Sequence, residues 1–226
     1  MRFQDAARDA RAVVYAGIQA DPLVARVASL LAEATTAERW LARAVMNGER
    51  ADPDRWRRTF PTLFRTSAPD EIRERAELLL AACLEVANRG EQARSSYRGA
   101  IVEELTARLL ARRSAPVRRE RRVLFDGVPA EIHPYDVTVE TDGRPEVYDC
   151  KWGARGINSD VLNQLDDARA HAAEEEVALN VVIVVFDARR SCELRLARAT
   201  ASHEHTGLVA LEALDSLLDS LTKPRR

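Results

Sequence analysis

Three ionisable residues of this chain lie inside sequence that otherwise reads as buried β-strand. Asp136 belongs to the stretch YDV, and Asp149 and Lys151 belong to the stretch YDCKW. An unpaired carboxylate in a strand interior is costly to bury, so these charges need partners. Because side chains alternate between the two faces of a strand, Asp149 and Lys151 project from the same face. If the preceding strand pairs in register, Asp136 joins them, and the three residues predict a site for a divalent cation.

The chemistry expected of such a site is hydrolysis of a phosphodiester. Carboxylate oxygens are hard ligands that suit Mg²⁺ or Mn²⁺. A bound ion of this kind lowers the pKa of a water ligand and neutralises charge on a phosphate oxygen. The compact ammonium of Lys151 would orient or help deprotonate that water and stabilise the developing charge, a task for which the larger, permanently protonated arginine is poorly suited.

The scarcity of lysine supports this interpretation. Lys223 is the one other lysine in the sequence, and arginine supplies all the remaining cationic side chains. Ordinary surface charge in this protein therefore comes from guanidinium groups, and Lys151 indicates a more specific role. The alternative is that Asp149 and Lys151 form an exposed ion pair on an edge strand, which would contribute little energy.

Composition limits the class of protein. The chain has 226 residues, 46% of them hydrophobic, and a formal net charge of -2, so a nucleic acid or membrane would have to be met by a local patch. Cys83, Cys150 and Cys192 are widely spaced and form no CxxC pair, which argues against a disulfide framework or a zinc site. With no apolar leader segment and no apolar run of membrane-spanning length, we expect a soluble, cytoplasmic protein without a membrane partner.

The pattern of the chain changes near residue 90. Residues 1–90 are rich in Ala, Leu, Arg and Glu at helical spacing and predict an all-helical N-terminal region. Residues 91–226 predict an α/β domain with a mixed sheet flanked by helices. Its expected elements are a long helix (91–113), three strands (123–125, 130–140 and 146–152), a second helix (158–175), a buried strand (179–186) and a leucine-striped last helix (208–221).

Together these features resemble the PD-(D/E)xK nuclease superfamily. Asp136, a turn, and then Asp149-Cys150-Lys151 are similar to its signature of an aspartate, a spacer and an (Asp/Glu)-x-Lys segment. The expected order of elements matches the restriction-endonuclease-like αβββαβ core of that superfamily. The resemblance covers about the second half of the chain. It implies Mg²⁺ or Mn²⁺ held by Asp136, Asp149 and the carbonyl of Cys150, with Lys151 activating the nucleophile and DNA as the substrate.

The resemblance extends to two more positions. Family members commonly carry an acidic residue on the helix before the first strand, and the sequence offers Glu103 and Glu104; we select Glu103 as the further metal ligand. In the branch related to RecB-type nucleases, a glutamine on the helix after the lysine belongs to the site, and Gln164 lies at a comparable position. That branch usually has a tyrosine one turn later, where this chain has Ala168, so the subfamily stays open.

Arginines near the first strand are candidates for contacts with the nucleic-acid backbone. Between residues 91 and 122 nine arginines stand against four glutamates. Such a run often forms a solvated surface, but phosphate contacts supply most sequence-independent DNA affinity, and these arginines adjoin the predicted site. The expected nucleic-acid-binding residues are Arg118, Arg119, Arg121, Arg122 and Arg155.

The sequence thus predicts a Mg²⁺-dependent deoxyribonuclease, with endonuclease favoured over exonuclease cleavage. The resemblance to the family implies a role in DNA restriction, repair or defence against mobile elements. The alternative is a catalytically inactive nuclease-fold module that binds nucleic acid or protein. A further alternative assigns the activity to the helical region, which would form a homodimer or bind a partner protein.

Overall fold

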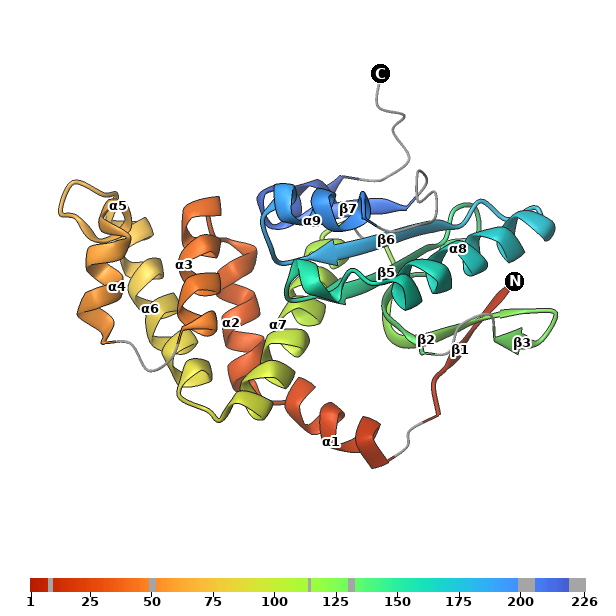
Figure 1. Cartoon of the computed structure of the whole chain (residues 1–226), viewed down its shortest axis with the longest axis horizontal. Coiled ribbons are helices and arrows are strands. Elements are labelled where there is room, and N and C mark those ends of the chain that lie inside the picture. Colours follow the sequence, from red (N-terminus) through yellow and green to blue (C-terminus); the bar gives the residue numbers. More distant parts are fainter. Residues whose placement is uncertain (8–9, 49–51, 114, 130–132, 199–205, 220–226) are drawn as a thin grey trace, which may run out of the picture. The chain divides into compact units, whose positions relative to one another are not determined.

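The structure is a computed structural model that describes residues 1–7, 10–48, 52–113, 115–129, 133–198 and 206–219 (Figure 1). The chain forms two compact units. The sheet unit comprises Met1–Asp9 and Thr106–Arg226, and the helical unit comprises Ala10–Leu105. The boundary between them falls within the helix α7, Glu91–Ala111, so a single helix contributes residues to both units.

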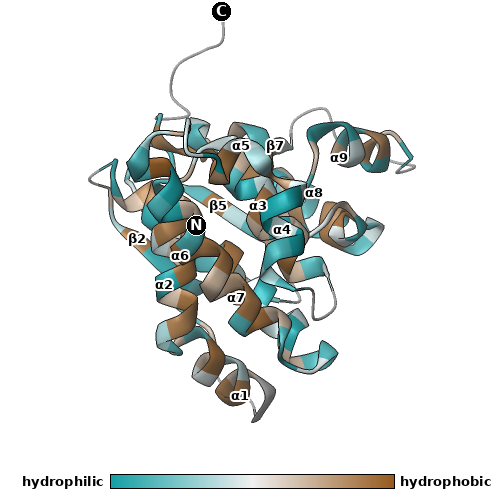
Figure 2. Ribbon diagram, turned by 90° about the vertical axis from the view of Figure 1, so that its left-hand side faces the viewer, coloured by the Kyte–Doolittle hydropathy of each residue, from teal (hydrophilic) through white to brown (hydrophobic). Residues whose placement is uncertain are grey.

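The helical unit is built from amphipathic helices. Their apolar residues recur every three or four positions, as Leu23, Val27 and Leu31 do in α2, and these side chains are buried. Figure 2 shows the resulting alternation of hydrophobic and hydrophilic residues along the ribbons. The helices that precede α7 are α1 (Ala10–Gln19), α2 (Pro22–Ala32), α3 (Thr36–Asn47), α4 (Pro53–Thr59), α5 (Pro61–Phe64) and α6 (Asp70–Ala87).

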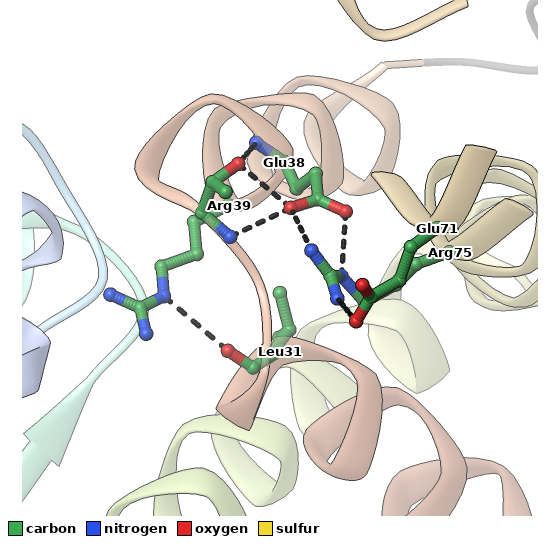
Figure 3. A network of polar contacts seen from close by, with 6 residues as sticks. Leu31, Glu38, Arg39, Glu71 and Arg75 are labelled. Atoms are coloured by element: carbon green, nitrogen blue, oxygen red, sulfur yellow. Dashed lines mark hydrogen bonds and ion pairs between the residues drawn. The ribbon is translucent and has the colours of Figure 1, made fainter. Parts of the chain in front are cut away.

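A buried carboxylate joins two of these helices (Figure 3). Glu38 of α3 is fully buried, and its side chain accepts the backbone N–H of Thr35 at 2.7 Å in a capping box at the start of that helix. Arg75 of α6 donates to both carboxylate oxygens of Glu38, at 2.8 and 3.0 Å. Arg39 donates from Nε to the carbonyl of Leu31 at 3.3 Å, which links α3 to α2. The buried charge is therefore fully compensated, and it fixes how α3 packs against α6.

The sheet unit contains one mixed sheet, which has seven strands among the described residues, in the order β1-β2-β4-β5-β6-β7 with β3 paired to β2. The pairs β1–β2, β2–β4 and β4–β5 are antiparallel, whereas β5–β6 and β6–β7 are parallel. After α7 the elements are β2 (Val117–Phe125), β3 (Val128–Pro129), β4 (Tyr135–Val139), β5 (Glu146–Lys151), η1 (Ala154–Gly156), α8 (Ser159–Glu174), β6 (Asn180–Val185), α9 (Arg189–Leu196), β7 (Gly207–Ala210) and η2 (Leu211–Leu218), and β1 is Arg2–Asp5.

Helices cover both faces of this sheet. Leu162, Leu165 and Ala168 of α8 are buried in a core cluster with Val147 and Ile183 on one face. On the other face, the end of α7 contacts β5, where the thiol of Cys150 lies 3.5 Å from the hydroxyl of Thr106. The prediction of an α/β fold with a mixed sheet flanked by helices is therefore confirmed.

Most of the elements predicted after residue 90 are present. The α8 helix begins after Asn158, the first residue of the range predicted to be helical, and the Asn158 side chain caps it by accepting the N–H of Val161 at 3.0 Å. Strand β6 falls within the apolar run of residues 179–186, and β4 falls within the strand predicted over 130–140, of which residues 130–132 lie outside the described part of the chain.

The N-terminus differs from the expectation of an all-helical region. Residues Arg2–Asp5 form strand β1, which pairs antiparallel with β2 so that Phe3 lies opposite Val123. Phe3 also packs against the core cluster of the sheet, and this burial favours the strand. The first nine residues thus belong to the sheet unit, and the second boundary lies between Leu105 and Thr106 rather than at residue 90.

The C-terminal leucine stripe also differs from the single helix that was predicted. Leu208 lies in β7, a parallel neighbour of β6, and residues 211–218 then form the 3₁₀ helix η2. Leu211, Leu214 and Leu217 are buried at a spacing of three residues, which matches the period of a 3₁₀ helix. Leu221 lies outside the described residues. Across the described helices of both units, none has the length and apolar character needed to cross a bilayer.

Candidate functional site

The register of β4 and β5 brings two acidic residues opposite each other. Val137 pairs with Tyr148 in this antiparallel ladder, and continuing the same register by one residue places Asp136 opposite Asp149. Directly opposed residues project from the same face of a sheet. The two carboxylates predicted to form the site therefore share one face, at the end of β5 and the beginning of β4.

A hydrogen bond holds the Asp136 carboxylate next to β5. The N–H of Cys150 donates to Oδ2 of Asp136 at 2.6 Å, and the carbonyl of Lys151 accepts from Phe186 N–H at 2.9 Å after β6. The carboxylate of Asp136 therefore lies against the backbone of the residue that follows Asp149. The carbonyl of Cys150 follows its own N–H toward β4. Two like charges at such a position require a cation.

Lys151 supplies one cation. Its ammonium forms an ion pair with Oδ1 of Asp149, and the Asp149 and Lys151 side chains are 12% and 27% exposed. Burial lowers the pKa of the Lys151 ammonium, but the charges of Asp149 and Asp136 outweigh it, so this pKa lies above its ordinary value. The structure thus brings Asp136, Asp149 and Lys151 together, and the lysine carries its proton at neutral pH.

A short turn after β5 packs against the stem of this lysine. The 3₁₀ turn η1 ends at Gly156, where an added Cβ would lie 2.9 Å from both Cγ and Cδ of Lys151. The carboxylate of Asp187, just after β6, accepts the N–H of Ala154 at 2.9 Å and the N–H of Ala188 at 2.7 Å. Asp187 therefore anchors the turn, and the turn restricts the lysine side chain.

Neither Asp187 nor Gly156 was identified from the sequence. Asp187 is the acidic residue that directly follows the apolar run of residues 179–186, and this position at the end of a buried strand was the available signal. Gly156 belongs to the stretch KWGARG, but its contact with the lysine stem depends on the fold of the turn.

Beneath the site, the opposite face of β5 carries a buried polar cluster. Arg113 donates to the two carboxylate oxygens of Glu146 at 2.9 and 2.7 Å, and the hydroxyl of Tyr148 donates to the same carboxylate. The Arg113 and Glu146 side chains are 8% and 2% exposed. Burial raises the pKa of Tyr148, as does the adjacent charge of Glu146. This cluster fixes β5 against the residues that follow α7.

The two helix residues of the predicted site have other described contacts. Gln164 of α8 donates from Nε2 to the carbonyl of His133 at 3.2 Å, just before β4. Glu103, in the helical unit, is buried and accepts from the hydroxyl of Tyr15 at 2.5 Å and from Nε2 of Gln19 at 2.8 Å. The roles of Gln164 and Glu103 in the site, and the choice between Glu103 and Glu104, stay predictions.

The predicted nucleic-acid-binding arginines have different surroundings. Arg121 is paired with Glu140, at 2.7 Å from Nε, and with Asp5, so its charge is compensated within the sheet unit. Arg118 and Arg119 line a cleft of about 460 Å³ beside the end of α7. Arg122 lies in β2, and Arg155 lies in η1 with an exposed side chain. Their contact with nucleic acid stays a prediction.

The donor atoms present fit a hard divalent cation. Oδ1 of Asp149 is buried and forms an ion pair with the lysine ammonium. No cluster of three or more His, Cys, Asp and Glu side chains able to hold a metal ion occurs in the described ranges. Mg²⁺ is commonly held by one or two carboxylates and several waters. Asp136, Asp149 and the carbonyl of Cys150 are donors of that kind.

Comparison with known proteins adds little to this geometry. No protein-family model matches the sequence, and no curated protein matches it. The chain is similar to the crystal structure of protein VC1899 from Vibrio cholerae, with 16% sequence identity and a TM-score of 0.49. This similarity covers 88% of the present chain and 55% of the Vibrio cholerae chain, so the present chain spans about half the length of that protein.

Proposed function

We propose that this protein is a Mg²⁺- or Mn²⁺-dependent nuclease that hydrolyses phosphodiester bonds in DNA. The observation that carries the proposal is the meeting of Asp136, Asp149 and the Lys151 ammonium on one face at the end of β5. The order α7, β2, β4, β5, α8, β6 supports a restriction-endonuclease-like core. Two carboxylates and a lysine in this order also fit the PD-(D/E)xK pattern.

Each residue of the proposed site has a distinct role. Asp136, Asp149 and the carbonyl of Cys150 hold the divalent ion. When bound, the ion supplies charge neutralisation at a phosphate oxygen and a water of lowered pKa. Lys151 orients the attacking water or helps to deprotonate it, and its ammonium stabilises the developing charge.

The direct test is metal-dependent cleavage by the purified protein and its Asp149→Asn variant. We expect the wild-type protein to cut plasmid or single-stranded DNA with Mg²⁺ or Mn²⁺ and to be inactive with a chelator. We expect Asp149→Asn to reduce the rate by about 100- to 1000-fold, because it removes a ligand charge from the reacting centre. Asp142→Asn, at an exposed turn, is the matched control and should retain full activity.

A wild-type protein that cuts no nucleic acid with either ion, or an Asp149→Asn variant as active as wild type, would contradict the proposal. One observation favours the second candidate, a nuclease fold that binds without cleavage: the described residues offer two acidic side chains at this face and no third. Metal-independent DNA binding with no cleavage in any ion would support that candidate.

Gly156→Ala tests the contact between η1 and the lysine. The added methyl would lie 2.9 Å from Cγ and Cδ of Lys151 and 3.0 Å from its Cβ, so the lysine stem must move. Since displacement by about 1 Å can reduce a rate by about 100-fold, we expect a fall of that order in cleavage rate with little change in melting temperature. The control is Gly143→Ala, where no atom lies within 4 Å of the added methyl. Equal rates for the two variants would show that the turn does not position the lysine.

A further inference from the structure

A cationic pocket lies immediately beyond the site strand. It has a volume of about 280 Å³, and its lining includes Arg155 from η1, Arg195 from α9, Arg198 just after α9, and Asp187. All three arginine side chains are exposed. Within the described residues, no hydrogen bond or ion pair engages any of the three guanidinium groups. By contrast, Arg189 on the same helix is paired with Glu193. The pocket therefore presents unused cationic groups.

The charge in this pocket favours an anion. Three guanidinium groups face one carboxylate, and that carboxylate, of Asp187, already accepts two backbone N–H groups at 2.9 and 2.7 Å. Asp187 is thus a structural anchor for both walls of the pocket, since it binds the first residue of η1 and the residue before α9. Ser191 adds a hydroxyl to the lining. Planar guanidinium groups match the oxygens of a phosphate, which they bind through paired hydrogen bonds.

The position of the pocket links it to the candidate site. The turn that carries Arg155 also packs against the Lys151 stem at Gly156. A phosphate in the pocket and a phosphodiester at Lys151 would therefore contact the same short turn, and they would belong to neighbouring positions of one nucleic-acid strand. No aromatic side chain lines the pocket, so it offers no stacking surface for a base.

We propose that Arg155, Arg195 and Arg198 bind a backbone phosphate of the DNA substrate next to the phosphodiester that is cut. The inference rests on the proposed nuclease function and adds a substrate subsite to it. The pocket reads the phosphate and not the base, so its contribution to binding is independent of DNA sequence and depends on salt. It holds the strand in place relative to Lys151.

The test is DNA binding by the double variant Arg195→Ala/Arg198→Ala, measured by fluorescence anisotropy in Ca²⁺ over a range of salt concentrations. Both side chains are exposed, so the fold should be retained. Loss of this one phosphate contact should reduce the magnitude of the slope of log K against log salt concentration by about 0.7 for single-stranded DNA to about 0.9 for a duplex. Arg190→Ala, which removes an exposed arginine of α9 outside the pocket lining, is the control and should keep the wild-type slope.

The inference is overturned if the double variant binds DNA with the wild-type affinity and slope, or if the reduction appears with RNA and not with DNA. Cleavage assays on the same proteins separate this result from the proposed function. If the wild-type protein cuts DNA and the double variant binds DNA as the wild type does, only the proposed phosphate subsite is overturned. If the wild-type protein binds DNA through the pocket but never cuts it, the nuclease proposal is overturned and the phosphate subsite is supported.

Discussion

Lys151→Met is expected to reduce DNA cleavage by about 1000-fold while the fold and DNA binding are retained. Methionine keeps a long flexible stem but removes the ammonium. That ammonium forms an ion pair with Asp149 and interacts electrostatically with Asp136. Removing a preorganised donor at a reacting centre typically reduces the rate by about 100- to 1000-fold, and here the donor is also charged. The measurement is the initial rate of plasmid cleavage in Mg²⁺, with DNA affinity measured in Ca²⁺.

Lys151→Arg separates the shape of the side chain from its charge. It preserves a positive charge, but the guanidinium is larger, and Gly156 already leaves no room for an added carbon beside the lysine stem. We therefore expect Lys151→Arg to be nearly as inactive as Lys151→Met. Full activity of the arginine variant would refute the view that this position needs a compact ammonium.

The lysine variants should also change how metal ions affect stability. In Lys151→Met, the buried Asp149 oxygen loses its cationic partner and faces a second carboxylate across the strand pair. Mg²⁺ or Mn²⁺ would then relieve the repulsion, and a ligand that binds only the folded state raises the melting temperature. An increase in melting temperature with either ion, absent in Asp136→Ala, would support these carboxylates as the metal ligands.

Glu146→Gln is expected to lower the free energy of unfolding by about 3 to 5 kcal/mol. It leaves the guanidinium of Arg113 buried without a counter-charge, and removal of one member of a buried ion pair is typically destabilising by this amount. Urea denaturation followed by circular dichroism measures the loss. Because Tyr148 donates to the same carboxylate, its hydrogen bond is weakened as well.

Two further variants serve as controls for the Glu146→Gln result. Glu193→Gln disrupts an exposed pair with Arg189, whose side chains are 53% and 60% exposed, and should change stability by less than about 1 kcal/mol. The double change Arg113→Met with Glu146→Leu removes both charges and should recover most of the lost stability. A Glu146→Gln variant no less stable than Glu193→Gln would show that the buried pair does not hold β5 in place.

Local patterns predicted the site because its residues are close in sequence or one hairpin apart. Asp149 and Lys151 share a face through simple strand alternation, and the turn at residues 141–144 brings Asp136 to the neighbouring strand. The start of α8 could be predicted at Asn158 because an N-cap residue bonds to backbone groups adjacent in sequence. Such features need only local geometry.

The parts that could not be predicted depend on distant contacts. Strand β1 forms because residues 2–5 pair with residues 121–124, more than a hundred positions away. The C-terminal leucines fit both a helix and a 3₁₀ segment, and pairing of residues 207–210 with β6 decides between them. The role of Asp187 likewise requires the fold to bring η1 beside the end of β6.

Strand β1 has a consequence for dissecting the molecule. The sheet unit is discontinuous in sequence, so the helical unit is an insertion between β1 and the rest of the sheet. A fragment that starts at residue 106 would lack β1 and would leave the outer edge of β2 with unsatisfied amide and carbonyl groups. Strands of other molecules could then pair with this edge and cause aggregation. A fragment of the sheet unit for biochemical assays is better obtained by joining the first seven residues to the sheet through a short linker in place of the insertion.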